Sequence, residues 1–473
     1  MTRFSGPIVV ALAIAAASVL VSFRSVYEPD LGWHLAQGRE NLAGRFVRTN
    51  VFSFTYPEYR QHYTSWLADT GAHAAWRLGG DAGIQALQAA AIAAALSLVY
   101  VACRVQSAVL PSLAILVLGF FVLEPRAMPR PHLASFAGMA ACSWLIQRSV
   151  ALRSVRPLWW AVPLAALWSN LHIEGVFGVV SIGLFAIGEL VRPSAITRQE
   201  AVRATTIAVC CVGALLVNPY GWGLFRYLYE NAFVPQILGI AELQPAYLPV
   251  YRAFFTYVGA ALLILLSLPR RFTVWEAATL LVFAAVGARY LRLTPLVFLS
   301  TAPMLASRLT SWSARGLDGR AVLAVALASA VFVSRVPLTT MIRGVRVGGV
   351  LPGVMFPERA LAFARAEGLS GPVFNSHNLG GWLAWTMYPG VRVFQDSRLQ
   401  AYPPEHFRAI LDASRSQPAW DSLVSGVDWA ILSLPRPNAL SGAGRFLPDG
   451  WATVYQDDAV EILVRRSGRF ASR

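Results

Sequence analysis

Long apolar stretches, separated by short polar segments, occupy most of the chain up to residue 335. They lie near residues 7–23, 84–103, 106–123, 132–147, 157–169, 174–190, 205–218, 253–268, 273–288, 293–307 and 320–335. A helix needs about 20 apolar residues to cross a hydrocarbon core of about 30 Å, and a bundle of helices accommodates somewhat shorter ones. The pattern therefore predicts a polytopic α-helical membrane protein with about eleven spans.

After residue 336 the pattern changes to short, mixed segments. It predicts strands at 372–375, 391–395, 429–434, 451–455 and 460–464, and helices at 357–368, 379–387 and 405–414. Strands that alternate with helices are typical of a small α/β domain. We therefore expect a membrane domain at 1–336, with a large first external loop at 24–83, and an α/β domain at 337–473.

Charge is scarce and unevenly placed. Only 14% of the 473 residues are charged, against about 25% in an average soluble domain, and the mean hydropathy is +0.51. The net charge is +15, and all 40 basic residues are arginines. Because the arginines are scattered between apolar stretches and form no basic face, we expect no nucleic-acid partner.

One set of short loops is rich in arginine and nearly free of acids. These arginines are Arg148, Arg153, Arg156, Arg192, Arg198, Arg203, Arg270, Arg271, Arg308, Arg315 and Arg320. Short basic loops are typical of the cytoplasmic side of a membrane protein. The amino terminus is therefore expected in the cytoplasm, and the 24–83 loop and the α/β domain are expected on the opposite side.

Two carboxylates and a histidine lie just after the first apolar stretch, at Glu28, Asp30 and His34. A carboxylate at a membrane surface can take a proton from an attacking hydroxyl or hold a divalent cation such as Mg²⁺ or Mn²⁺. The alternative is that these acids are only solvated at the interface. Trp33 and Leu35 indicate that the loop returns towards lipid, where idle acids are unfavourable. All three are candidate catalytic residues, and Asp30 is also the candidate metal ligand.

Basic side chains also occur on the face where the arginine pattern disfavours them. Arg126, Arg130 and His132 lie between two apolar stretches, and Arg289 and Arg292 lie in a later turn. A guanidinium presents a planar fork of N–H donors that matches phosphate oxygens. Snorkelling to lipid head groups is the alternative. These five residues are candidate ligands of a lipid phosphate.

Further polar side chains occur where an apolar segment or a strand ends. The candidates for an acceptor site or pocket are Asn170, His172, Glu174, Asn375, His377, Trp382, Asp396 and Arg398. Polar groups at membrane depth are costly and often functional, and polar residues at strand ends beside glycines form binding edges. The alternative is that these residues cap helices. For Asp396 and Arg398, a further alternative is that they form an internal ion pair.

Six short motifs occur in a characteristic order. They are Asp30–Gly38, Arg130–His132, Trp168–His172, Asn218–Gly221, Asn375–Trp382 and Phe394–Arg398. Together they resemble the GT-C superfamily of membrane glycosyltransferases, and in particular poorly characterised bacterial GT-C-like membrane proteins. The resemblance extends over most of the chain, and Asp30 takes the place of the superfamily's first-loop acid.

The resemblance implies an inverting sugar transfer at the outer face of a bacterial inner membrane. The donor would be a sugar linked to polyprenyl phosphate or diphosphate, and the acceptor an extracytoplasmic glycan, lipid or protein. Asp30 would activate the acceptor, and the arginines would stabilise the departing lipid phosphate. The competing interpretation is a non-catalytic scaffold or a transporter in cell-envelope polysaccharide assembly. A transporter is expected to show inverted repeats, and none is visible in the sequence.

The arginine pattern makes a testable prediction about topology. A reporter enzyme that is active only outside the cytoplasm should be active when it is fused after Arg473, because residues 337–473 are expected on the outer face. Activity of a cytoplasm-only reporter at the same position would show that the number of spans differs from the prediction by an odd number.

Overall fold

The computed structural model describes residues 6–25, 28–61, 63–233, 241–247, 251–266, 273–313, 318–334, 342–348, 357–413, 415–434 and 450–470. The chain forms two compact units. The first consists of Met1–Arg24, Gln85–Leu224 and Gly239–Val347, and the second of Ser25–Ile84, Phe225–Leu238 and Gly348–Arg473. These two units are defined by how compactly the chain packs and not by which segments lie in lipid. The expected division into 1–336 and 337–473 therefore stays a prediction.

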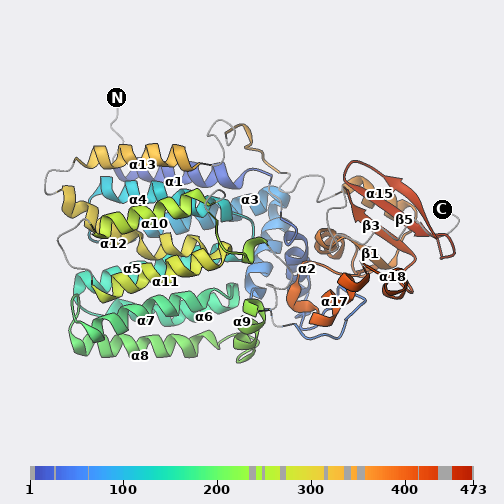
Figure 1. Ribbon diagram of the computed structural model, residues 1–473, viewed down its shortest axis with the longest axis horizontal. Coiled ribbons are helices and arrows are strands. Elements are labelled where there is room, and N and C mark those ends of the chain that lie inside the picture. The colour runs from blue at the N-terminus through green and yellow to red at the C-terminus, as the bar shows by residue number, and fades with distance from the viewer. Residues whose placement is uncertain are drawn as a thin grey trace. The chain divides into compact units, whose positions relative to one another are not determined.

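The first unit is a bundle of α-helices that run side by side (Figure 1). Its helices are α1 (Gly6–Ser22), the later part of α3 (Trp66–Arg104), α4 (Val109–Leu123), α5 (His132–Leu152), α6 (Ala161–Leu171), α7 (Gly175–Val191), α8 (Arg198–Leu215), α10 (Arg252–Leu266), α11 (Val274–Arg289), α12 (Pro295–Ser313) and α13 (Gly319–Val333). Each predicted apolar stretch overlaps one of these helices. The prediction of a mainly helical architecture is therefore confirmed.

Among the described residues, two helices are long and apolar enough to cross a membrane, Trp66–Arg104 and Val109–Arg126. Four more are apolar but shorter, and these are Pro7–Ser22, Gly175–Val191, Arg252–Leu266 and Gly319–Val331. The count of about eleven spans and the side on which each terminus lies stay predictions. Arg270, Arg271 and Arg315, and the ends of the predicted elements 253–268, 320–335 and 405–414, lie outside the described residues.

Local sequence explains where helices begin and bend. α11 begins at a capping box, in which the Thr273 hydroxyl accepts from the backbone N–H of Glu276 and the Glu276 carboxylate accepts from the backbone N–H of Thr273. α3 bends at Gly79 and Gly80, and Gly80 has a φ of +55°. That left-handed conformation is costly for a residue with a Cβ, so the glycine permits the bend.

The second unit contains a five-stranded mixed sheet in the order β2-β1-β3-β5-β4. Its strands are β1 (Gly371–Asn375), β2 (Val391–Val393), β3 (Trp429–Ser433), β4 (Trp451–Gln456) and β5 (Val460–Arg465). β1 pairs in parallel with β2 and β3, whereas β5 pairs antiparallel with β3 and β4. The accompanying helices are α15 (Glu358–Ala366), α16 (Gly380–Met387), α17 (Pro404–Ala413) and α18 (Gln417–Leu423). The predicted strands and the α/β character are confirmed, and α18 was not predicted.

Both faces of this sheet are buried. Val373 and Ile431 belong to one apolar cluster, which also contains Trp382. Phe374, the next residue along β1, belongs to a second cluster with Trp420. Successive side chains of a strand point to opposite faces, so these two clusters lie on the two sides of the sheet.

The predicted first loop is largely ordered and belongs to the same unit as the sheet. It contains α2 (Leu31–Leu42) and the beginning of α3. Its middle part lies beside β2, because Val393 N–H donates to Phe52 O (3.0 Å) and Phe54 N–H donates to Val393 O (3.2 Å). Residues 52–54 therefore continue the sheet beyond β2, although more than 300 residues of sequence separate the two segments.

Glycines allow α2 to approach α16 closely. A Cβ on Gly32 would lie 2.5 Å from the carbonyl carbon of Gly381 and 2.6 Å from its oxygen. A Cβ on Gly381 would lie 2.9 Å from the backbone oxygen of Pro29. Because these neighbours are backbone atoms that cannot rotate away, only glycine fits at both positions. This contact holds the start of α2, and with it Asp30, against the sheet's helix.

We expect Gly32→Ala to destabilise the protein. The added methyl forces α2 away from α16, and overpacking of this kind typically costs about 1–3 kcal/mol. The check is the thermal midpoint of the purified protein in detergent. Gly71→Ala is the control, since a Cβ there meets nothing within 4 Å and alanine favours the helix. Equal midpoints for Gly32→Ala and the wild type would contradict the close contact.

Candidate functional site

Asp30 directly precedes α2. It is held by residues that lie near it in the sequence and by Ser397, which lies far along the chain. The Ser397 hydroxyl donates to Asp30 Oδ1, and Trp33 Nε1 donates to Ser397 Oγ (3.1 Å). The backbone N–H of Asp30 donates to Glu28 Oε1 (3.1 Å). Asp30 is partly exposed, whereas Glu28 is buried. The arrangement presents one oriented and accessible carboxylate, which can accept a proton from a nearby hydroxyl.

His34 lies one turn further along α2 and belongs to a buried polar group. Its Nδ1 lies 2.6 Å from Asp69 Oδ1 and 3.0 Å from the Tyr63 hydroxyl oxygen. The Trp33 ring stacks on the imidazole, with ring centroids 3.7 Å apart. Burial, and next the negative charge of Asp69, raise the pKa of Tyr63 well above its ordinary value, so the phenol keeps its proton. A carboxylate on one imidazole nitrogen fixes the tautomer and orientation of the ring.

Asp396 and Arg398 form a fully buried ion pair. Arg398 donates from Nε to Asp396 Oδ1 (2.9 Å) and from Nη2 to Asp396 Oδ2 (2.7 Å). It also donates to the side-chain oxygens of Asn50 (2.7 Å) and Gln61 (3.1 Å), and its guanidinium lies over the Phe52 ring. The pair thus joins residues 50–61 to the sheet. This geometry favours a structural role, and a role in acceptor binding stays a prediction.

The other candidates near the sheet are Asn375, Trp382 and His377, and each has different neighbours. The buried Asn375 amide bridges two segments, since it donates to Gln395 O (2.8 Å) and accepts from Phe394 N–H (2.9 Å). Trp382 is 3% exposed and lies in the apolar core. Burial lowers the pKa of His377, and the charges of Asp396 and Asp30 oppose that shift. His377 is thus the pocket candidate within electrostatic reach of Asp30.

In the first unit, three of the four candidate arginines gather around one acid, Glu242. Arg126 Nη2 and Arg130 Nη1 lie 3.1 Å and 3.0 Å from Glu242 Oε2. Arg292 contributes a third positive charge that acts on the same carboxylate. We call these four residues the arginine–glutamate cluster. The fourth candidate, Arg289, is exposed, and its guanidinium lies over the neighbouring Tyr290 ring.

The cluster is assembled from short turns rather than from long helices. Arg126 ends η1 (Glu124–Arg126), Glu242 lies in η4 (Ala241–Leu243), and Arg292 lies in η5 (Leu291–Leu293). Burial alone would raise the pKa of Glu242, but the charges of Arg130, Arg126 and Arg292 outweigh it and hold the pKa below its usual value. Glu242 is therefore ionised, and the cluster carries a net positive charge.

Histidines and a second acid lie next to these arginines. His132 Nε2 lies 2.6 Å from the backbone oxygen of Arg126, and the rings of His132 and His172 are 6.3 Å apart. His172 Nδ1 lies 2.9 Å from Ser135 Oγ and 3.5 Å from Glu174 Oε2. Arg292 also acts electrostatically on Glu174. The structure therefore brings together His132, His172 and Glu174, which the sequence analysis had placed in two separate groups.

Asn170 has a different position from its sequence neighbours. Its side-chain N–H groups donate to the backbone oxygens of Ala166 (2.8 Å) and Val217 (2.7 Å). Ala166 lies within α6 and Val217 lies two residues after the end of α8, so the Asn170 side chain joins these two segments. Its predicted place in an acceptor pocket is not tested by these contacts.

Asp30 is the predicted ligand of a divalent cation. Within the described part of the chain, no three His, Cys, Asp or Glu side chains gather in a metal-binding arrangement. Glu174 and Glu242, two further acids that could serve as metal ligands, lie beside His172 and beside Arg126 and Arg130 respectively. A divalent cation held by Asp30 stays a prediction.

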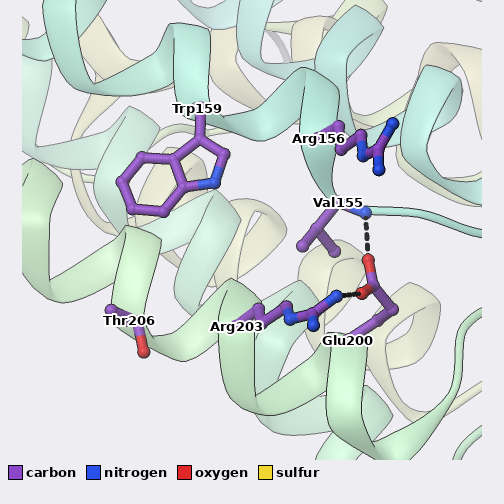
Figure 2. A pocket seen from close by; sticks show the side chains of 6 residues that line it. All are labelled: Val155, Arg156, Trp159, Glu200, Arg203 and Thr206. Carbon is purple, nitrogen blue, oxygen red and sulfur yellow. Dashed lines mark hydrogen bonds and ion pairs between the residues drawn. The ribbon is translucent and has the colours of Figure 1, made fainter.

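A cavity of about 320 Å³ lies between the turn η2 (Arg156–Trp160) and the amino-terminal half of α8. Figure 2 shows Arg156 and Trp159 on one side and Glu200, Arg203 and Thr206 on the other. Glu200 accepts from Val155 N–H (2.7 Å) and pairs with Arg203. None of the predicted site residues lines this cavity. Its arginines belong to the loops expected on the cytoplasmic side.

No protein-family model and no curated protein matches the sequence. Solved structures do match the fold. The apo oligosaccharyltransferase of Archaeoglobus fulgidus has a TM-score of 0.60 and 10% identity, over 89% of this chain and 69% of that one. ArnT of Cupriavidus metallidurans, solved bound to undecaprenyl phosphate, has a TM-score of 0.55 and 13% identity, over 98% of both chains. The arabinofuranosyltransferase AftD from Mycobacteria has a TM-score of 0.55 and 16% identity.

This chain spans only 40% of the AftD chain, although the match covers 98% of its own length. The Archaeoglobus enzyme has also been solved in complex with Zn and sulfate, with a TM-score of 0.53 and 11% identity. At these identities the likeness shows the fold. The chain therefore has a fold similar to those of these glycosyltransferases, in agreement with the fold that its sequence motifs led us to expect.

Sequence reasoning missed several residues that the structure places in the site. Ser397, which donates to Asp30, was quoted only as part of a motif, and Asp69 and Tyr63 were not candidates. Asp69 follows His34 by 35 residues, and Ser397 follows Asp30 by 367. No periodicity links positions so far apart. A buried acid near the start of a long apolar helix, such as Asp69, was the one signal available.

The buried Asp396–Arg398 pair generates a stability prediction. Arg398→Met leaves the Asp396 carboxylate buried without its partner, and breaking such a pair typically costs about 3–5 kcal/mol. The check is the thermal midpoint in detergent, with Arg392→Gln, an exposed arginine on β2, as the control. The double variant Asp396→Asn with Arg398→Met should recover part of the loss. If Arg398→Met were as stable as the wild type and lost only acceptor binding, the structural role would be wrong.

Proposed function

We propose that this chain is a membrane glycosyltransferase that moves a sugar from a polyprenyl-phosphate or polyprenyl-diphosphate donor to an extracytoplasmic glycan, lipid or protein. The fold supports this proposal, because the similar structures include an oligosaccharyltransferase and an arabinofuranosyltransferase. ArnT, which has the same fold, was solved with undecaprenyl phosphate, which supports a lipid-linked donor.

The observation that carries the proposal is the environment of Asp30. The Ser397 hydroxyl donates to its carboxylate, its backbone N–H donates to the Glu28 carboxylate, and its side chain is partly exposed. The Ser397 hydroxyl orients one carboxylate oxygen of Asp30, and the partly exposed side chain can meet a group that approaches from outside the protein. That is the property required of a general base.

In the proposed reaction, the acceptor's oxygen or nitrogen attacks the anomeric carbon of the donor sugar. Its proton passes to Asp30, a new glycosidic bond forms, and the bond from the sugar to the phosphate oxygen breaks. Attack from the face opposite the leaving group inverts the configuration. The departing lipid phosphate carries away the electron pair, and its negative charge is stabilised by Arg126, Arg130 and Arg292. His34 supports the site by fixing Trp33, on which it stacks.

The same assignment places the protein in the cytoplasmic membrane of a bacterium, with the amino terminus inside and the reacting groups outside. The arginine-rich loops support this orientation. Asn375 and His377 remain proposed contributors to the acceptor pocket, and His377 is favoured because it lies within electrostatic reach of Asp30.

The test is turnover by the purified Asp30→Asn variant with saturating lipid-linked sugar. This change keeps the side-chain volume and removes the charge, and loss of a well-placed general base typically lowers the rate by about 10²–10⁴-fold. Binding of the donor should persist, because the arginines are unchanged. Glu58→Gln is the matched control, since it removes an exposed acid from the same predicted loop and should react like the wild type. Near-normal turnover by Asp30→Asn would remove Asp30 from the mechanism, whereas absence of turnover by the wild type would favour the scaffold interpretation.

A further inference from the structure

Glu242 occupies the position that an external anion is expected to take. Its Oε2 lies between two guanidinium groups, 3.1 Å from Arg126 Nη2 and 3.0 Å from Arg130 Nη1, and its Oε1 lies 3.3 Å from Arg130. Arginine forks bind carboxylates and phosphates with the same bidentate geometry. The carboxylate of Glu242 therefore makes contacts that two oxygens of a phosphate group could make.

The arginines around Glu242 have more N–H donors than one carboxylate can accept hydrogen bonds from. Arg126 is 6% exposed, and its Nε is buried without a hydrogen-bond partner in the described part of the chain. The same holds for Nε of Arg292. Buried donors without partners are costly, and the cost is relieved when an acceptor arrives. A phosphate offers more acceptor oxygens than a carboxylate, so it fits this set of donors better.

Glu242 can leave the arginines without disturbing the core. Its side chain is 25% exposed, so it is less enclosed than the Arg126 side chain, which is 7% exposed. The segment that carries it is held separately, because Leu291 N–H donates to Gln244 O (3.1 Å) and Ala246 N–H donates to Ala288 O (2.9 Å). The neighbouring Leu243 is 4% exposed and anchors the turn. The side chain can therefore exchange while the backbone stays in place.

We propose that Glu242 is an internal anion that competes with the donor's phosphate for Arg126 and Arg130, and so sets the affinity and selectivity of the phosphate site. The proposal rests on the proposed function, since it takes the arginines as the phosphate site. In the absence of donor, Glu242 keeps the three arginines from repelling one another. A weakly charged or single-oxygen ligand cannot replace it, whereas a phosphate with several charged oxygens can.

The test is equilibrium binding of undecaprenyl phosphate to the purified full-length protein in detergent, with undecaprenol as the uncharged comparison. Glu242→Gln removes the competing charge and keeps the shape. We expect it to bind undecaprenyl phosphate roughly tenfold more tightly than the wild type, because the arginines are left without a counter-charge. Binding of undecaprenol should not change. Glu200→Gln is the matched control, since it removes the same charge from a different Glu–Arg pair and should bind like the wild type.

Arg130→Gln separates this inference from the assignment on which it rests. If Arg130→Gln weakens phosphate binding and Glu242→Gln weakens it too or leaves it unchanged, then Glu242 is not a competitor, and the arginines remain the phosphate site. If neither variant alters phosphate binding, both the inference and the arginine assignment are wrong. Should Glu242→Gln fail to fold, Glu242→Asp keeps the charge on a shorter side chain and should bind a few-fold more tightly than the wild type. Equal or weaker binding by that variant would overturn the inference.

Discussion

The buried guanidinium of Arg398 is the contact on which the geometry around Asp30 depends. A buried charge is tolerated only when its donors are satisfied, and Arg398 satisfies them with Asp396, Asn50 and Gln61. Two of these partners come from the first seventy residues, and one, Asp396, comes from the segment that follows β2. The ion pair therefore fixes residues 50–61 next to β2, and the adjoining Ser397 reaches Asp30 as a consequence.

The glycine contact and this ion pair have complementary effects. Gly32 and Gly381 let two helices approach until their backbones touch, which gives contact area but little directional specificity. The hydrogen bonds of Arg398 are directional, because the N–H groups of a planar guanidinium point in fixed directions within its plane. Together they hold a single partly exposed carboxylate in a defined orientation, as a general base requires.

In the arginine–glutamate cluster, unlike in the Asp396–Arg398 pair, the positive charges exceed the negative charge. Three positive charges surround one carboxylate, and two buried donors have no partner in the described residues. The side chains of this cluster do not provide hydrogen-bond acceptors for all of its N–H donors. The cluster is therefore suited to bind an external anion. The second unit, by contrast, pairs its buried charge internally. The difference between satisfied and unsatisfied charge distinguishes a structural pair from a proposed binding site.

The sequence alone determined the secondary structure and much of the site's composition. Apolar stretches of helical length predicted the helices, short mixed segments predicted β1 to β5, and the acid after the first stretch pointed to Asp30, because these signals are local. The sequence could not show that Ser397 donates to Asp30, that Asp69 pairs with His34, or that Glu242 joins Arg126 and Arg130. Those contacts join positions far apart in the chain, and only packing and the need to satisfy buried charge bring them together.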